Sequence, residues 1–227
     1  MISLALPEAE LSTFALAASD RVSRREPSAL RLDGTVEMGQ VISIPLDISL
    51  AGDDSILKHF LQTEAECFRF HLLRFSCGFL PKEGEAFDRA RLEISLRRED
   101  DVQTDAPIAW SMQPRRLSAQ VENTKEVQIG SKLEILDLGV KVGRKTTQDE
   151  SFLEAFGEQS PRPFWEFKQT SMVTLQGSFQ LHLIVRSPRI ASTRGEVSLS
   201  VIVRRTTYRL FYKDSLFPVQ PMTFRLT

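Results

Sequence analysis

An acidic residue placed two positions before a lysine is the nearest approach to a catalytic motif in this sequence. Glu166 and Lys168 lie in a short aromatic segment, with Asp149 and Glu154 upstream. Carboxylates at this spacing can hold Mg²⁺ while the lysine polarises an attacking water, which is the chemistry of a metal-dependent hydrolase. A chain this rich in acids also produces such a pair by chance. We therefore interpret Glu166 and Lys168 as surface residues of a strand.

A glycine-rich segment resembles a phosphate-binding loop without completing it. Gly139 and Gly143 are followed by Arg144 and Lys145, but three residues separate the glycines where the motif has four. That loop depends on fixed spacing to aim successive backbone N–H groups at phosphate. We expect a basic β-hairpin here.

The histidines and cysteines are too sparse for a metal centre. His59, His71 and His182 have no acidic or cysteine partner at ligand spacing, and a zinc or iron site needs three or four converging ligands. We therefore predict no catalytic residue, no metal and no cofactor. His182 stands between two apolar residues in an alternating segment, so its side chain is expected to point to the opposite face and to lie at the surface. Cys67 and Cys77 match no metal pattern and are expected to be reduced thiols, which favours a cytoplasmic protein.

Arginines near the end of the chain are the remaining candidates for a site. We select Arg186, Arg189, Arg194, Arg204 and Arg205 as candidate binding residues. Arg186, Arg189 and Arg194 surround a predicted turn. Arg204 and Arg205 lie at the end of the strand that follows it. If the two flanking strands pair as a hairpin, the two groups of arginines lie at opposite ends of it.

Charge is divided along the chain although the net charge is only −1. Residues 1–110 sum to −7 and residues 111–227 to +6. A dipolar molecule of this kind can pair with a copy of itself, or present its basic part to an acidic partner or a nucleic acid. The alternative is that the fold intermixes the two halves in space.

Apolar and polar residues alternate along most of the chain, which is the period of a half-buried strand. Trp165 and Phe167 are expected to point inward from one such strand. Strands that have one solvent-exposed face and are joined by short polar connections favour antiparallel sheets. We therefore predict an all-β fold, mainly an antiparallel β-sandwich. The clearest alternating segments are 42–50, 90–97, 117–121, 173–185, 197–203, 208–212 and 222–226.

One or two short helices should interrupt the strands. Asp54 or Ser55 can cap a helix whose apolar residues fall on one stripe. A capping-box pattern predicts a second, shorter helix that begins near Thr147 and stops at Gly157. The segment 7–18 suits a helix or a strand, and both remain open.

The whole chain, 1–227, is expected to form a single elaborated sandwich domain. The alternative is an acidic β lobe over 1–105 and a basic β lobe over 106–227, linked by the polar stretch 97–107. Arg or Glu recurs in every hydrophobic segment, so no segment has the ~20 uncharged apolar residues that a spanning helix requires. We expect no membrane contact and, because the amino terminus lacks a basic leader, no secretion.

These observations favour a non-catalytic binding or assembly module, an accessory subunit that mediates protein–protein interaction or self-association. Exposed sheet edges and the divided charge suit a protein partner or a homo-oligomer. The alternative is a nucleic-acid-associated subunit that uses the basic C-terminal half. A metal-dependent hydrolase ranks third.

Overall fold

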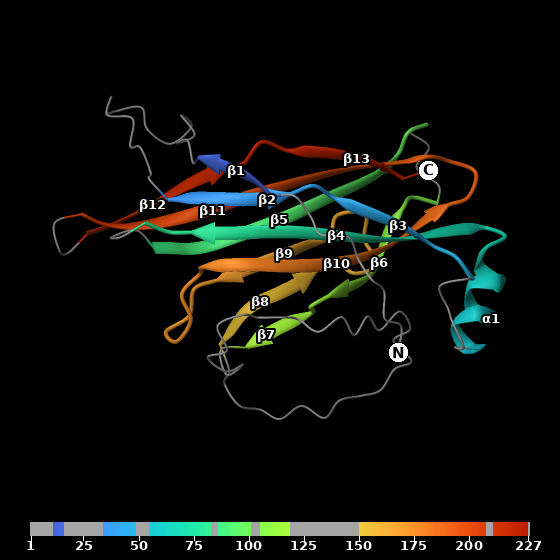
Figure 1. Cartoon of the computed structure of the whole chain (residues 1–227), viewed down its shortest axis with the longest axis horizontal. Helices are drawn as coiled ribbons and strands as arrows, with labels where there is room; N and C mark the ends of the chain where they lie inside the picture. Colours follow the sequence, from blue (N-terminus) through green and yellow to red (C-terminus); the bar gives the residue numbers. More distant parts are fainter. Residues whose placement is uncertain are drawn as a thin grey trace.

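The computed structural model describes residues 11–15, 34–48, 55–82, 86–100, 105–118, 150–207 and 211–226. Within them, two antiparallel sheets form a sandwich, with one short helix at one end (Figure 1). The prediction of an all-β sandwich is confirmed. The glycine-rich segment 139–146 and Asp149 lie outside the described residues.

The first sheet has the strand order β1-β2-β4-β10-β6, and β3 also pairs with β4. Because β3 pairs with no second strand in the described part of the chain, Pro45 lies on an edge strand, where its missing N–H costs no ladder hydrogen bond. The bounds are β1 (Leu11–Ala15), β2 (Thr35–Gly39), β3 (Ile42–Leu46), β4 (Phe68–Leu80), β6 (Ile108–Gln113) and β10 (Gly177–Pro188).

The second sheet has the order β12-β11-β5-β9-β8-β7, and β13 also pairs with β11. The pairs β4–β10 and β5–β11 join strands from either side of the stretch 97–107, so the acidic and basic halves intermix in space. We propose one sandwich for the whole chain on this basis. The bounds are β5 (Ala86–Arg98), β7 (Arg116–Ser118), β8 (Ser151–Phe156), β9 (Phe164–Lys168), β11 (Thr193–Thr207), β12 (Phe211–Pro218) and β13 (Met222–Leu226).

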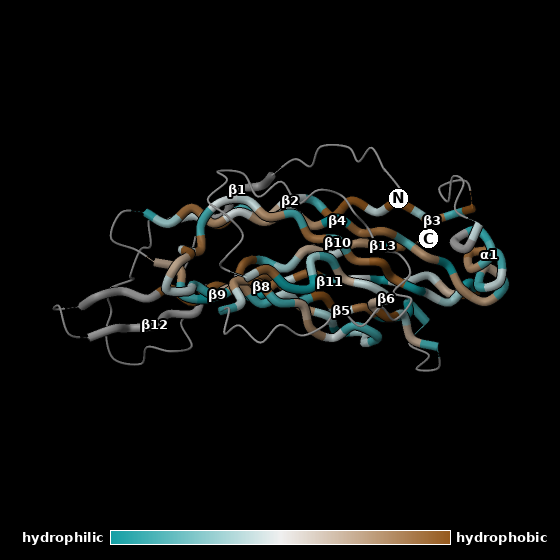
Figure 2. Tube along the Cα trace, turned by 90° about the horizontal axis from the view of Figure 1, so that it is seen from below, coloured by the Kyte–Doolittle hydropathy of each residue, from teal (hydrophilic) through white to brown (hydrophobic). Residues whose placement is uncertain are grey.

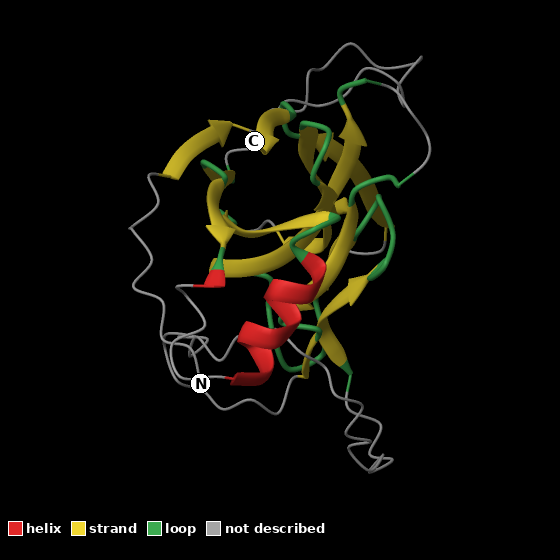
Figure 3. Cartoon of the chain, turned by 90° about the vertical axis from the view of Figure 1, so that its right-hand side faces the viewer, coloured by secondary structure: helices red, strands yellow, loops and turns green. Residues whose placement is uncertain are grey.

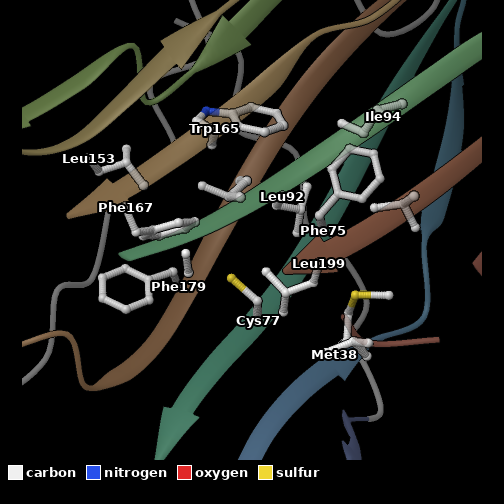
Figure 4. Close-up of a cluster of buried hydrophobic side chains, with 14 of the residues drawn as sticks. Met38, Phe75, Cys77, Leu92, Ile94, Leu153, Trp165, Phe167, Phe179 and Leu199 are labelled. Atoms are coloured by element: carbon white, nitrogen blue, oxygen red, sulfur yellow. The ribbon is translucent and has the colours of Figure 1, made fainter. Parts of the chain in front are cut away.

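The main core lies between the two sheets, which Figure 2 shows as two layers. Trp165 and Phe167 of β9 point inward, as predicted, and both are fully buried. The ring of Phe167 lies 5.2 Å from that of Phe79, and the ring of Trp165 lies 6.1 Å from that of Phe75. The Trp165 indole N–H also donates to the Pro114 carbonyl oxygen at 3.0 Å, so its one polar group is satisfied. Figure 4 shows Phe75, Trp165 and Phe167 among the buried side chains of this core.

A smaller core lies on the outer face of the first sheet, under helix α1 (Ser55–Glu64). Phe60 of α1 contacts Phe70 and Trp110 at ring distances of 5.4 and 5.8 Å. The predicted helix at Ser55 is therefore confirmed, and it covers one end of the sandwich (Figure 3). No helix in the described ranges is long and apolar enough to cross a membrane.

The second predicted helix is wrong, because residues 151–156 form β8. This strand pairs with β7 on one side and β9 on the other, which satisfies its backbone groups through the sheet. Leu153 points into the core while Phe156 points outward and is 37% exposed. A helix would have placed both on one stripe, so tertiary pairing overrides a local capping signal here.

The hairpin that would join 173–185 to 197–203 is also absent from the described strands. β10 pairs with β4 and β6, whereas β11 pairs with β5, β12 and β13. The turn at 189–192 instead carries the chain from the first sheet to the second. Residues on the outer faces of β10 and β11 consequently lie on opposite sides of the sandwich.

The outer edge of β6 is covered by a loop. The Met112 N–H donates to Glu158 Oε1 at 3.0 Å, and the Ala109 N–H donates to the Ser160 carbonyl oxygen at 3.0 Å. These bonds occupy the donors that a foreign strand would need, which protects the edge from pairing. The expected use of sheet edges for association therefore does not apply to β6.

We predict that Gly195→Ala destabilises the sandwich. Gly195 of β11 lies opposite Phe224 of β13, and a Cβ at this position would stand 2.0 Å from Phe224 Cζ. Relieving that overlap should cost about 1–3 kcal/mol of unfolding free energy, measured by urea denaturation. Ser198→Ala, on the outer face of the same strand, is the control and should change stability by less than about 0.5 kcal/mol. Equal stability of the two variants would contradict the packing described.

Candidate functional site

Arg186 packs against the small core under helix α1, and Arg189 bonds to the backbone just past the end of that helix. Arg186 is half-buried on the outer face of β10, with its guanidinium carbon 4.3 Å from the ring centroid of Phe68 and 5.0 Å from that of Trp110. Arg189, in the turn after β10, donates through Nη1 to the Ala65 carbonyl oxygen at 2.6 Å, just past the end of the helix. Cation–π packing and bonding to the last carbonyls of a helix are structural uses of these side chains.

Arg194, Arg204 and Arg205 all lie on β11, away from Arg186. Arg204 and Arg205 are near the far end of the strand, in register with Asp214 and Lys213 of β12, and their side chains lie outside the described residues. Arg194 is near the start of β11 and is exposed on the outer face of the second sheet. The structure therefore does not bring the five selected arginines together into one patch.

Arg194 instead stands between two arginines that sequence reasoning missed. It is in register with Arg97 of β5 and with Arg225 of β13, and all three side chains are exposed on the same face. We call Arg97, Arg194 and Arg225 the arginine row. The three positions are far apart in the sequence, so the antiparallel register was needed to find them.

The arginine row carries unbalanced positive charge. Arg225 has an ion pair with Glu99, but Arg97 and Arg194 have no ion-pair partner among the described residues. The next arginine along β5, Arg98, turns away from the row and pairs with Asp100. Side chains directly opposite on neighbouring strands have Cβ atoms about 5 Å apart, and like charges at that distance destabilise a sheet.

A second patch of opposite character lies on the same outer face. Glu154 of β8 is in register with Glu166 of β9, and Phe156 of β8 is in register with Phe164 of β9. Phe164 is also in register with Glu93 of β5. We call these five residues the acid–aromatic patch. Glu166 has an ion pair with Arg89 and Glu93 has one with Arg91, whereas Glu154 has none in the described ranges, although Arg116 of β7 is in register with it.

The rings of the acid–aromatic patch already contact one guanidinium. Phe156 and Phe164 are stacked, with centroids 4.9 Å apart and an interplanar angle of 19°. The Arg91 guanidinium carbon lies 3.7 Å from the Phe164 centroid, and Arg91 Nη2 lies 3.3 Å from Glu93 Oε2. The patch therefore has the ring faces and carboxylates that bind a guanidinium.

Glu166 and Lys168 are outward-facing strand residues, as the sequence indicates. Glu166 lies 3.8 Å from Arg89, and Lys168 is exposed. In the part of the chain that the structure describes, no three His, Cys, Asp or Glu side chains are grouped to hold a metal ion. Glu154 and Glu166 therefore lack a described third ligand, and Asp149 lies outside the described residues.

His182 is not a surface residue, although its place in the alternating pattern predicts one. It points away from the main core, as predicted, but is only 5% exposed, beside the equally buried Arg74 of β4. Parity identifies the face on which a side chain lies but not whether that face is covered. Burial, together with the Arg74 charge, lowers the pKa of His182 to about 4.

The two cysteines are free thiols in different surroundings. Cys67 is exposed, whereas Cys77 of β4 is buried in the main core. Burial raises the pKa of the Cys77 thiol to about 12, so this side chain packs as a neutral apolar group.

Comparisons with known proteins add no family. No family model and no curated protein match this sequence. The solved structures that overlap with it include the membrane-inserted form of the Clostridium perfringens NetB toxin, at 8% identity and a TM-score of 0.35 over 96% of this chain and 94% of that one. A protein described as a pore forming protein aligns at 9% identity and a TM-score of 0.31, over 99% and 92% of the two chains. Clostridium perfringens delta-toxin aligns at 6% identity and a TM-score of 0.27, over 96% of this chain and 86% of that one. TM-scores this low establish neither a shared fold nor a shared function.

We predict that the buried His182 makes the fold sensitive to acid. Between pH 6.5 and about 4 the unfolded chain binds a proton at this position that the folded chain does not, so stability falls as the pH falls through this window. The loss is at most about 3 kcal/mol at pH 4. Urea unfolding at pH 7 and pH 4.5 should show a smaller difference for His182→Gln than for the unaltered chain.

The same substitution at the exposed His59 is the matched control for this measurement. His59→Gln should retain the pH dependence of the unaltered protein. If His182→Gln and His59→Gln respond equally to pH, His182 is not the group responsible.

Proposed function

We propose that this chain is a non-catalytic binding module whose arginine row docks an acidic surface of a protein partner. The observation that carries the proposal is the set of three exposed guanidinium groups on neighbouring strands, two of them without an ion-pair partner among the described residues. Such an arrangement is unfavourable in the isolated chain and becomes favourable when carboxylates lie against it.

Arginine suits this role better than lysine would. Its planar guanidinium forms paired, parallel hydrogen bonds with a carboxylate, which adds geometric specificity to the charge attraction. Adjacent strands in a sheet hold the row at a spacing of about 4.8 Å. The rigid sheet therefore presents the three groups without a large ordering cost on binding.

The charges around the arginine row favour a protein partner over a nucleic acid. The same outer face carries Glu93, Glu154 and Glu166, as well as Glu196 next to the row. A nucleic-acid backbone that crossed this face would meet these carboxylates, because its negative charge repeats at every phosphate. A protein surface can place acids opposite the row and other groups elsewhere.

We predict that Arg194→Glu weakens the binding of an acidic probe by at least about tenfold. The probe is a fluorescein-labelled oligoglutamate peptide, and the measurement is its fluorescence anisotropy with the full chain. Binding should also weaken between about 0.1 M and about 1 M NaCl, as the screening length falls from about 10 Å to about 3 Å.

Arg69→Glu makes the same charge change at an exposed position on β4 of the first sheet and serves as the control. It should leave oligoglutamate binding within about twofold. Equal weakening by both substitutions would show that net charge, not the arginine row, attracts the probe. A single-stranded oligonucleotide that binds more tightly than oligoglutamate, and loses its affinity in Arg194→Glu, would replace the proposed protein partner with a nucleic acid.

A further inference from the structure

We propose that the acidic surface docked by the arginine row is the acid–aromatic patch of a second copy of this chain. The inference rests on the proposed function and names the partner of the same site. Two copies would meet through the outer faces of their second sheets, with each arginine row against the other copy's patch.

The two patches lie at opposite corners of one face. Along β5, Arg97 is four residues from Glu93, which is about 13 Å at the rise of a strand. Across the sheet, β8 is two strands from β5 on one side, while β13 and β11 lie on the other. The patches are therefore separate enough to contact different parts of a partner at the same time.

This separation is compatible with two-fold symmetry. A two-fold axis that lies in the plane of contact, midway between the patches, brings the arginine row of each copy onto the acid–aromatic patch of the other. The same pairing then occurs twice in the dimer. A self-complementary contact of this kind closes and does not continue into a filament.

Both patches contain like-charge pairs, and their signs are opposite. Arg194 is in register with Arg97 and Arg225, whereas Glu154 is in register with Glu166. The arginine row destabilises its own sheet in the isolated chain, whereas Arg89 and Arg91 already pair with Glu166 and Glu93. Glu154 is left without an ion-pair partner among the described residues, and an arginine of the second copy would supply one.

The aromatic pair, Phe156 and Phe164, provides a specific binding position for a guanidinium group of the second copy. Arg91 already lies against the Phe164 ring within one chain, at 3.7 Å from the centroid. Phe156 is stacked on Phe164 and is itself 37% exposed. An arginine from the second copy can therefore lie against Phe156 as Arg91 lies against Phe164, with Glu154 close by to accept hydrogen bonds.

The size of the face limits the strength of the contact. The span from Arg89 to Arg97 is about 27 Å, and six strands from β13 to β7 cover about 24 Å, so about 650 Å² of projected area is available per copy. A standard stable interface uses about 800 Å² per partner. We therefore expect a reversible dimer that depends on protein concentration and on salt.

The first test is the mass of the full chain in solution by sedimentation equilibrium. The unaltered protein should dimerise at about 0.1 M NaCl and dissociate as the salt approaches about 1 M. Arg194→Glu and Glu154→Arg should each weaken dimerisation by at least about tenfold, because each places like charges across both contacts. Arg69→Glu should leave the dimer unchanged.

The second test mixes the two weakened variants in equal amounts. In a mixed dimer, the carboxylate introduced by Arg194→Glu in one chain would face the guanidinium introduced by Glu154→Arg in the other. The native pair would form at the second contact. Arg194→Glu and Glu154→Arg should therefore form a dimer together although neither does so alone. If either variant unfolds, Arg194→Gln and Glu154→Gln replace them and should each weaken the dimer of the unaltered chain.

Several outcomes would overturn the inference. One is an unaltered chain that stays monomeric at low salt yet binds oligoglutamate through Arg194, which refutes the second copy as partner but leaves the proposed function intact. Another is a dimer that persists at about 1 M salt or ignores both substitutions, which indicates association elsewhere. Failure of the mixed variants to associate also refutes the pairing of the two patches. An unaltered chain that neither dimerises nor binds oligoglutamate at low salt refutes the proposed function as well.

Discussion

The contact between the inner faces of the two sheets determines where every outer residue lies. Trp165 and Phe167 of β9 pack against Phe75 and Phe79 of β4, and these buried rings fix which side of each strand faces inward. Side chains alternate along a strand, so a shift of one residue would move these rings to solvent and bring charged neighbours into the core. The free energy of burying aromatic side chains thus also sets the positions of the arginines and glutamates on the opposite face.

Because the core fixes the strand register, side chains of like charge are placed next to one another on the outer face of the second sheet. Once β5, β11 and β13 take the register that fills the core, Arg97, Arg194 and Arg225 must stand side by side. The register of β8 with β9 likewise places Glu154 opposite Glu166. Each repulsion is small beside the burial of the core, so the fold tolerates both. The result is a rigid face on which Arg97, Arg194 and Glu154 have no ion-pair partner among the described residues, and we propose that this face binds a copy of the same chain.

The sequence was sufficient for the features that depend on local alternation. The run at 90–97, the inward Trp165 and Phe167 and the helix at Ser55 follow from spacing alone, because apolar residues on one side of an element must be buried. The helix predicted near 147–157 was wrong because pairing with β7 and β9 outweighs a local capping pattern.

Features that depend on which strands are neighbours could not be read from the sequence. β10 and β11 follow each other along the chain but lie in different sheets, so Arg186 and Arg194 end on opposite sides of the sandwich. His182 is buried because its face is covered, which parity does not report. The sequence around Arg97 and Arg225 does not mark them as binding residues, because only the antiparallel register places them beside Arg194.

The most direct test of the central claim is a double-mutant cycle on dimerisation with Arg194→Gln and Glu154→Gln. The dissociation constants of the unaltered chain, each single variant and the double variant give the coupling free energy between the two side chains. If the arginine row of one copy faces the acid–aromatic patch of the other, the coupling should be about 1 kcal/mol or more. Within one chain the two residues lie on strands three apart in the sheet, too far for direct contact. Additive effects of the two substitutions, with a coupling near zero, would contradict the account.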